Sequence, residues 1–368
     1  MVHFYESSIV TTVDDLHFQV YANEHPKGRI IAKPKYIPTD KICCDSLQFR
    51  FIAGKKMNRL NFWIDKKELA KYFEDFKKTY PQYIHQSKMH DTWFFVIPVD
   101  RIEKVYSPQK GLKELMGMPV KCLDSHLKNV YEFVNFITQS GVPPEKLGIT
   151  YSTLVGTYFL NISDINITVY GKNNFWKLMD FLKAAKHPKL RWKTDEEWLD
   201  YKRHRNRASV FSDEEFLMNM KRKRSEGFFD NHLFVLFGVE EPQEIKNKWG
   251  HEKCTSLGFV KIRAIVTDNY NSVVRPGYFD VKDSEIIEGV HKNKVIKVNK
   301  VVFYSRDYVM QAFPNERIEA AGLLQKVVPV GKGENKPHHR IVIGYFDAYV
   351  SDRRGKEYIK MIKDDQNE

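Results

Sequence analysis

Asp164 and Asn166 are the residues of this sequence whose types and spacing most suggest chemistry. They stand in Ser163-Asp-Ile-Asn-Ile-Thr-Val-Tyr170, where the β-branched run Ile165–Tyr170 predicts a strand. Residues i and i+2 of a strand point to the same side, so the Asp164 carboxylate and the Asn166 amide are expected to face one site. Carboxylate oxygens are the protein ligands that Mg²⁺ prefers, and an amide binds it more weakly. The spacing therefore predicts a carboxylate and a neutral amide on one side of a strand.

The residues around this pair predict a compact α/β unit. Leu147–Thr150 reads as a strand, and a turn with Ser152 and Gly156 follows it. After the second strand, Gly171 and Asn174 lead into a helix whose apolar residues repeat on one face. The expected order is strand, turn, strand and helix, with the turn beside the start of the second strand.

The segment 148–176 resembles the signature of polymerase-beta-type nucleotidyltransferases. In that family a Gly-Ser turn opens a short helix, and Ser-Asp-x-Asp follows on a strand about ten residues later. The resemblance implies transfer of a nucleoside monophosphate from a nucleoside triphosphate to a hydroxyl of a nucleic acid or other acceptor, with Mg²⁺ or Mn²⁺ as cofactor. It assigns metal binding to Asp164 and nucleotide binding to Ser152, Thr153, Gly156 and Ser163.

Two positions depart from that signature. Tyr151 stands where the motif has glycine, and Asn166 stands where it has the second acid. A bulky side chain crowds the approach of phosphates to the turn. A neutral amide weakens a site that holds two cations close together. A working nucleotidyltransferase and a catalytically inactive relative that binds nucleic acid therefore both stay open.

The third carboxylate of such sites comes from a later strand. Asp230 is the preferred candidate, because it stands at the start of the apolar run 229–238, which predicts a buried strand. Asp268 is the second candidate. The predicted catalytic set is thus Asp164, Asn166 and Asp230, with metal binding by Asp164 and Asp230.

The resemblance is closer to an archaeal group of nucleotidyltransferase-like proteins and covers most of the chain. The matching segments are Ser-Asp-Ile followed by Tyr170-Gly-Lys and Asn174-Phe-Trp, His25-Pro-Lys-Gly-Arg-Ile-Ile-Ala, Tyr106-Ser-Pro, Tyr304-Ser-Arg-Asp-Tyr and Ala321-Gly-Leu-Leu-Gln-Lys-Val. The resemblance does not identify the acceptor.

A basic segment follows the α/β unit, with the aromatic residues Trp192, Trp198 and Tyr201 interleaved. It could track the phosphates of nucleic acid, or it could be a solvated helix face. The excess of 59 Lys and Arg over 47 Asp and Glu, a net charge of +12, slightly favours nucleic acid. The predicted contacts are Lys202, Arg203, Arg205, Arg207, Lys221, Arg222, Lys223 and Arg224.

Composition excludes several other classes. No apolar run approaches the roughly 18 residues that span a bilayer, and the N-terminus does not resemble a signal peptide, so a cytoplasmic protein without a membrane partner is expected. The four cysteines lack CxxC spacing, which favours reduced thiols. Motifs of P-loop, dinucleotide-binding, serine-hydrolase and zinc-protease sites are absent.

The expected fold is α+β with three domains. A polymerase-beta-like core at 106–250 is flanked by an N-terminal α+β domain at 1–105 and a small β-barrel or sandwich at 251–368. Ser125 is the expected N-cap of a helix in the core, and Ser212 and Glu215 form a predicted capping box. The other predicted elements are a helix at Lys66–Thr79 and strands at Leu16–Ala22, Arg29–Tyr36, Leu47–Ile52, Trp93–Pro98, Phe259–Val266, Lys294–Phe303, Leu324–Val330 and Arg340–Val350.

Overall fold

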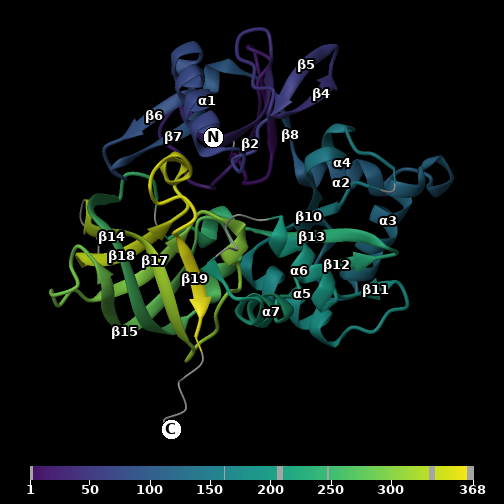
Figure 1. Ribbon diagram of the computed structural model, residues 1–368. Helices are drawn as coiled ribbons and strands as arrows, with labels where there is room; N and C mark the ends of the chain where they lie inside the picture. Colours follow the sequence, from purple (N-terminus) through teal and green to yellow (C-terminus); the bar gives the residue numbers. More distant parts are fainter. Residues whose placement is uncertain (1–2, 161, 205–209, 247, 331–335, 363–368) are drawn as a thin grey trace.

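The computed structural model describes residues 3–160, 162–204, 210–246, 248–330 and 336–362. Within these ranges the chain forms three β-sheets with helices packed on them, so the α+β class is confirmed (Figure 1). None of the helices described is long and apolar enough to cross a membrane.

The N-terminal sheet is antiparallel and carries one helix. Its strands run in the order β4-β5-β3-β2-β1-β8, with β7 paired to β3 and β6 to β7. Helix α1 (Lys66–Thr79) has the predicted bounds, because the Asp65 carboxylate caps its first amides and four apolar side chains repeat along one buried face. The strands are β1 (Ile9–Thr12), β2 (His17–Val20), β3 (Arg29–Pro38), β4 (Gln48–Ile52), β5 (Lys55–Arg59), β6 (Ile84–Ser87), β7 (Thr92–Pro98) and β8 (Ile102–Tyr106).

The middle sheet has the order β11-β12-β13-β10-β9, and β10 and β13 run parallel. One face of β10 (Ile165–Tyr170) packs Ile165, Ile167 and Val169 against helices α3 (Ser125–Thr138) and α5 (Lys172–Ala184). The opposite face, with Asn166, is therefore left for a site. The remaining elements are α2 (Pro108–Met116), β9 (Leu147–Ile149), α4 (Tyr151–Val155), β11 (Leu190–Arg191), β12 (Glu226–Phe229) and β13 (His232–Val239).

The third sheet closes into a small barrel, because β14 pairs with β17 as well as with β15. Two helices from the preceding part of the chain, α6 (Asp195–Arg203) and α7 (Asp213–Lys221), contribute Trp198 and Phe216 to the barrel core. The division at 105 and 250 stays a prediction. The strands are β14 (Glu252–Asp268), β15 (Gly277–Gly289), β16 (Val298–Phe303), β17 (Arg317–Pro329), β18 (His338–Ile343) and β19 (Tyr358–Met361).

The three sheets are packed against one another. Tyr304, Tyr345 and Phe346 of the barrel region belong to the core of the N-terminal sheet. At the junction of the middle sheet with the barrel, a Cβ on Gly238 would lie 2.2 Å from the carbonyl oxygen of Val273. Glycine is therefore required where β13 meets this backbone.

Several sequence predictions were wrong in detail. Asp124, one residue before Ser125, caps α3 by accepting from the Leu127 amide. The run 229–238 is two strands, because Asp230 and Asn231 adopt positive φ angles of 48° and 62° and turn the chain between β12 and β13. The predicted strand Arg340–Val350 ends at Ile343 and is followed by a 3-10 helix, Phe346–Val350. The predicted strand Lys294–Phe303 begins at Val298.

Candidate functional site

Strand register places the sequence motif on one row of the middle sheet. Asn166 of β10 pairs with Val235 of β13, and Val235 pairs with Glu226 of β12. Paired residues share a face, so Asn166, Val235 and Glu226 point to the same side. Asp164 precedes β10, and its backbone carbonyl accepts from the Asn166 amide at 3.2 Å. All four residues line one pocket.

Helix α4 forms the floor of the same pocket through Ser152. The helix is held from outside the motif, because the Thr150 hydroxyl just before it donates to the backbone carbonyl of Ser7 at 2.7 Å. It ends at Gly156, which adopts the left-handed conformation at φ 71°. The structure thus brings Ser152, Ser163, Asp164 and Asn166 together.

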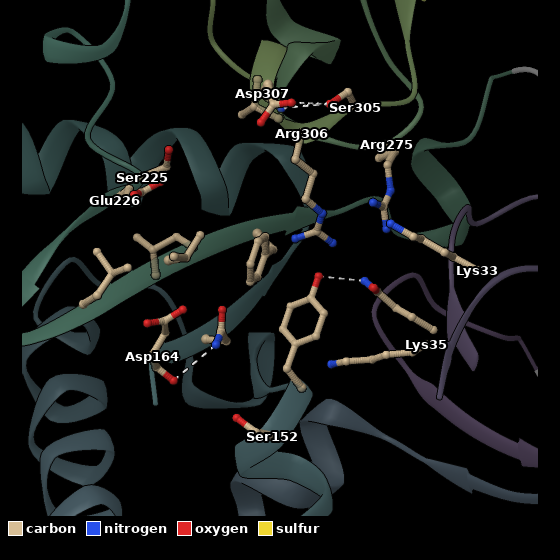
Figure 2. A pocket seen from close by; sticks show the side chains of 18 of the residues that line it. Lys33, Lys35, Ser152, Asp164, Ser225, Glu226, Arg275, Ser305, Arg306 and Asp307 are labelled. Carbon is tan, nitrogen blue, oxygen red and sulfur yellow. Dashed lines mark hydrogen bonds between the residues drawn. The ribbon is translucent and has the colours of Figure 1, made fainter. Parts of the chain in front are cut away.

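The pocket has a volume of about 610 Å³, and its walls come from the N-terminal and middle sheets and from segments between the barrel strands that carry Arg275 and Arg306. Figure 2 shows Asp164 and Glu226 on one side, and Arg275, Arg306, Lys33 and Lys35 on the other. A cavity of this size suits a ligand as large as a nucleotide. Its polar lining is acidic on one side and basic on the other.

Tyr151 lines the pocket and contacts residues of both neighbouring sheets. Its hydroxyl accepts from the Gln19 side-chain amide at 2.9 Å, and its ring lies 4.1 Å from the Lys35 ammonium. The ring centroid also lies 5.5 Å from that of Phe237, on β13. The residue that replaces the motif glycine therefore fills space next to the Ser152 turn and holds the basic side in place.

Two arginines share a single buried carboxylate on the basic side. Glu6 is fully buried, and its Oε1 lies 2.6 Å from an Arg275 nitrogen and 2.5 Å from an Arg306 nitrogen. Arg306 also donates to the Ser7 hydroxyl at 2.6 Å, and its guanidinium lies 3.7 Å from the Phe237 ring centroid. The two guanidinium groups and the one carboxylate therefore have a net charge of +1.

The same two arginines also have buried hydrogen-bond donors without acceptors. In the described part of the chain, Nε of Arg275 and Nη1 of Arg306 are buried and have no hydrogen-bond partner. Such groups cost free energy unless a partner is supplied. An anionic ligand would meet both the charge and the donors.

Two lysines in the pocket are poised to change charge near neutral pH. Burial, together with the positive charges of Arg59 and Lys33, lowers the pKa of Lys35 to about 7. Burial also lowers the pKa of Lys223 to about 7, although Glu226 opposes the shift. The ammonium of Lys223 donates to the Asp307 carbonyl at 2.6 Å. An anion bound near either group would favour its charged form.

The face of the middle sheet that carries Asn166 has too few carboxylates to bind two metal ions. Asn166 is neutral, and the neighbouring strand presents the apolar residues Val235 and Phe237. Glu226 is already ion-paired with Lys193. In the described ranges no group of three or more His, Cys, Asp or Glu side chains is placed to hold a metal ion. The residues present therefore do not fit a two-metal site.

Other predicted site residues lie away from the pocket. Asp230, at the β12–β13 turn, pairs with Lys189 at 3.4 Å, and Asp268 accepts from the Tyr270 amide. The hydroxyl of Thr153 is hydrogen-bonded to the buried His126 at 2.9 Å. None of these three, nor Gly156, lines the pocket. The structure thus does not bring Asp230 into the pocket with Asp164, and Glu226 is the acid of the row that lines the pocket.

The predicted nucleic-acid segment is largely paired within the chain. Lys202 contacts Asp213, Arg203 contacts Asp200, Lys221 contacts Asp195 and Arg222 contacts Glu316, each through an ion pair. Lys223 is buried, and Arg224 lies over the Trp192 ring at 4.6 Å. Arg205 and Arg207 lie outside the described residues. These contacts support the interpretation of the segment 202–224 as a solvated helix face.

The basic side was missed by sequence reasoning. Glu6, Arg275 and Arg306 are distant in sequence and belong to no common motif. A weak signal existed for Arg306, which lies in Tyr304-Ser-Arg-Asp-Tyr, one of the segments that carried the family resemblance.

Comparison with known proteins identifies a similar chain but does not assign an activity. The chain is 26% identical over 352 residues to an uncharacterized protein of Methanocaldococcus jannaschii, a match that covers 94% of this chain and 98% of that protein. No family model and no solved structure matches the chain. The likeness extends over nearly the full length of both chains.

Proposed function

We propose that the chain is a nucleotidyltransferase-like protein with a polymerase-beta-like core, and that its pocket binds a nucleoside triphosphate. The observation that carries the proposal is the pair of arginines that share Glu6, with buried donors that no described residue satisfies. A polyphosphate carries several negative charges and many acceptor oxygens, so it matches the positive charge and the free donors of the two arginines. Ser152 and Asp164 lie on the facing side of the same pocket (Figure 2).

We further propose that binding, and not rapid transfer, is the principal activity. Asn166, Val235 and Phe237 supply no carboxylate beside Asp164, so the charge needed to hold two divalent cations close together is missing. Slow transfer of a nucleoside monophosphate with Mg²⁺ or Mn²⁺ is the second candidate. It is supported by the placement of Ser152, Asp164 and Asn166 in one pocket.

Calorimetric titration with ATP, ADP, AMP and adenosine in EDTA tests the first proposal. We expect affinity to fall by about tenfold for each phosphate removed, or about 1.4 kcal/mol per step. Binding should not require a divalent metal, because the cations of the wall are part of the protein. Equal affinity for adenosine and ATP would contradict the proposal. Incorporation of α-labelled nucleotide into an oligonucleotide, at rates typical of enzymes, would favour the second candidate.

Binding should be coupled to proton uptake. At pH 8 the Lys35 amine, with a pKa near 7, is mostly neutral in the free protein. A bound polyphosphate favours the ammonium and raises this pKa, so the complex takes up a proton and affinity falls as pH rises above 7. Calorimetry at pH 8 in two buffers of different ionisation enthalpy measures the uptake. Lys35→Met should remove a large part of it, and unchanged uptake in that variant would exclude Lys35 as its source.

A further inference from the structure

A group of exposed apolar side chains lies at the entrance of the pocket. Phe159, Leu160 and Ile162, which follow helix α4, are 53%, 50% and 78% exposed. Phe159 and Ile162 also line the pocket. Large apolar side chains gathered in the open usually mark a binding surface.

The hairpin β4–β5 adds cations next to these side chains. The Arg50 guanidinium lies 5.6 Å from the Phe159 ring centroid and donates to neutral acceptors, the Phe49 carbonyl and the Gln48 amide. Arg59 pairs with Gln48 across the hairpin, so it lies on the same face as Arg50. In the described part of the chain, Arg50 and Arg59 make no ion pair with a carboxylate. This contrasts with the paired cations of the segment 202–224.

The two groups form one continuous surface with the pocket. Arg50 and Arg59 of the hairpin line the pocket together with Phe159 and Ile162, and the less exposed Ser152 and Asp164 line it as well. We call Arg50, Arg59, Phe159, Leu160 and Ile162 the entrance surface. A chain molecule lying on it would have one end at the pocket.

We propose that the entrance surface binds a single strand of nucleic acid, with one end of the strand directed toward Ser152 and Asp164. Unpaired bases stack on aromatic rings and guanidinium planes, and unpaired cations attract phosphates. Phe159 beside Arg50 offers both kinds of contact. A duplex keeps its base faces covered and cannot use the ring. The role of the strand end rests on the proposed nucleotide site, but strand binding itself does not.

Fluorescence anisotropy with labelled single-stranded RNA and DNA dodecamers tests the assignment. Phe159→Ala should weaken binding of the better strand by about fivefold or more, the effect of losing one base–aromatic stack. Arg50→Gln should reduce the slope of log affinity against log salt by about 0.7, the value for one phosphate contact on a single strand. The same sequence as a duplex should bind more weakly to the parent.

Two substitutions of exposed residues elsewhere serve as matched controls. Lys221→Gln removes a cation of the segment 202–224, and Val295→Ala shortens an apolar side chain that is 97% exposed. Both should leave strand binding unchanged. The assignment is overturned if Lys221→Gln weakens binding more than Arg50→Gln, if duplex binds as well as single strand, or if vesicles with anionic lipid bind in place of the oligonucleotide.

Measurements on the parent protein separate this inference from the proposed function. If the parent binds the strand but not ATP, the entrance surface stands and the nucleotide proposal fails. If it binds ATP but no strand, the nucleotide proposal stands and the entrance surface is refuted.

Discussion

Replacing Arg306 by methionine is expected to lower the affinity for ATP by about a hundredfold and to leave the protein folded. Arg306 is one of two cations on Glu6, so its removal leaves a balanced pair of Glu6 and Arg275. Losing a desolvated, hydrogen-bonded charge contact costs about 2–5 kcal/mol of binding free energy. Each 1.4 kcal/mol is a factor of about ten. Calorimetry with ATP at pH 7 and low salt measures the loss, and a thermal melt confirms the fold.

Arg263→Met is the matched control for this experiment. Arg263 lies on the barrel strand β14, is 54% exposed and pairs with Glu319, outside the pocket. The same change of side chain there should leave ATP affinity within about twofold, because exposed ion pairs contribute little. An unchanged affinity in Arg306→Met, or an equal loss in Arg263→Met, would remove the basic side from the nucleotide site.

Replacing Asn166 by aspartate is expected to create Mn²⁺ binding that the parent lacks or shows weakly. The change keeps the shape of the side chain and places a second carboxylate on the same side as Asp164. Without metal the two charges repel each other and destabilise the variant. Mn²⁺ binds between them, so its affinity should rise by about tenfold or more, and the melting temperature of the variant should rise with Mn²⁺ concentration.

The double variant Asn166→Asp with Asp164→Asn controls for this result. It carries a single carboxylate, as the parent does, and should lose the gain in Mn²⁺ affinity. If Asn166→Asp also gains transfer of labelled nucleotide, the rest of the catalytic site is intact. If it gains metal binding alone, Tyr151→Gly should be needed as well, because the Tyr151 ring fills the space beside Ser152. A parent that transfers nucleotides rapidly, and keeps that rate in Asp164→Ala, would place the chemistry elsewhere.

Local sequence patterns predicted the fold well where the residues that specify a helix or strand lie within that element. Helix α1 and the capping box of Ser212 and Glu215 follow from spacing and caps that lie within a few residues. The run 229–238 was misjudged because apolar residues continue on both sides of the turn. Asp230 and Asn231 are residue types that adopt positive φ, so a hairpin was readable there.

The site could be predicted from sequence on one side and not on the other. Ser152, Asp164 and Asn166 lie within one short segment, so a strand and a turn suffice to bring them together. Arg275 and Arg306 become neighbours of Glu6 when the barrel packs against the other sheets, and no local pattern encodes that contact. In the segment 202–224 nucleic-acid binding stays a prediction, and several of its described cations form ion pairs that sequence spacing does not reveal.

The position of Glu6 affects how the chain folds while it is being synthesised. Domains generally fold in order as a chain leaves the ribosome, yet Arg306 follows Glu6 by 300 residues. A carboxylate buried without its partner costs several kcal/mol, so the segment with Glu6 cannot settle until the barrel has been translated. The Ser7 carbonyl then accepts from Thr150, and its hydroxyl accepts from Arg306. The nascent protein thus acquires its pocket at the end of translation, and a prematurely terminated product should lack it.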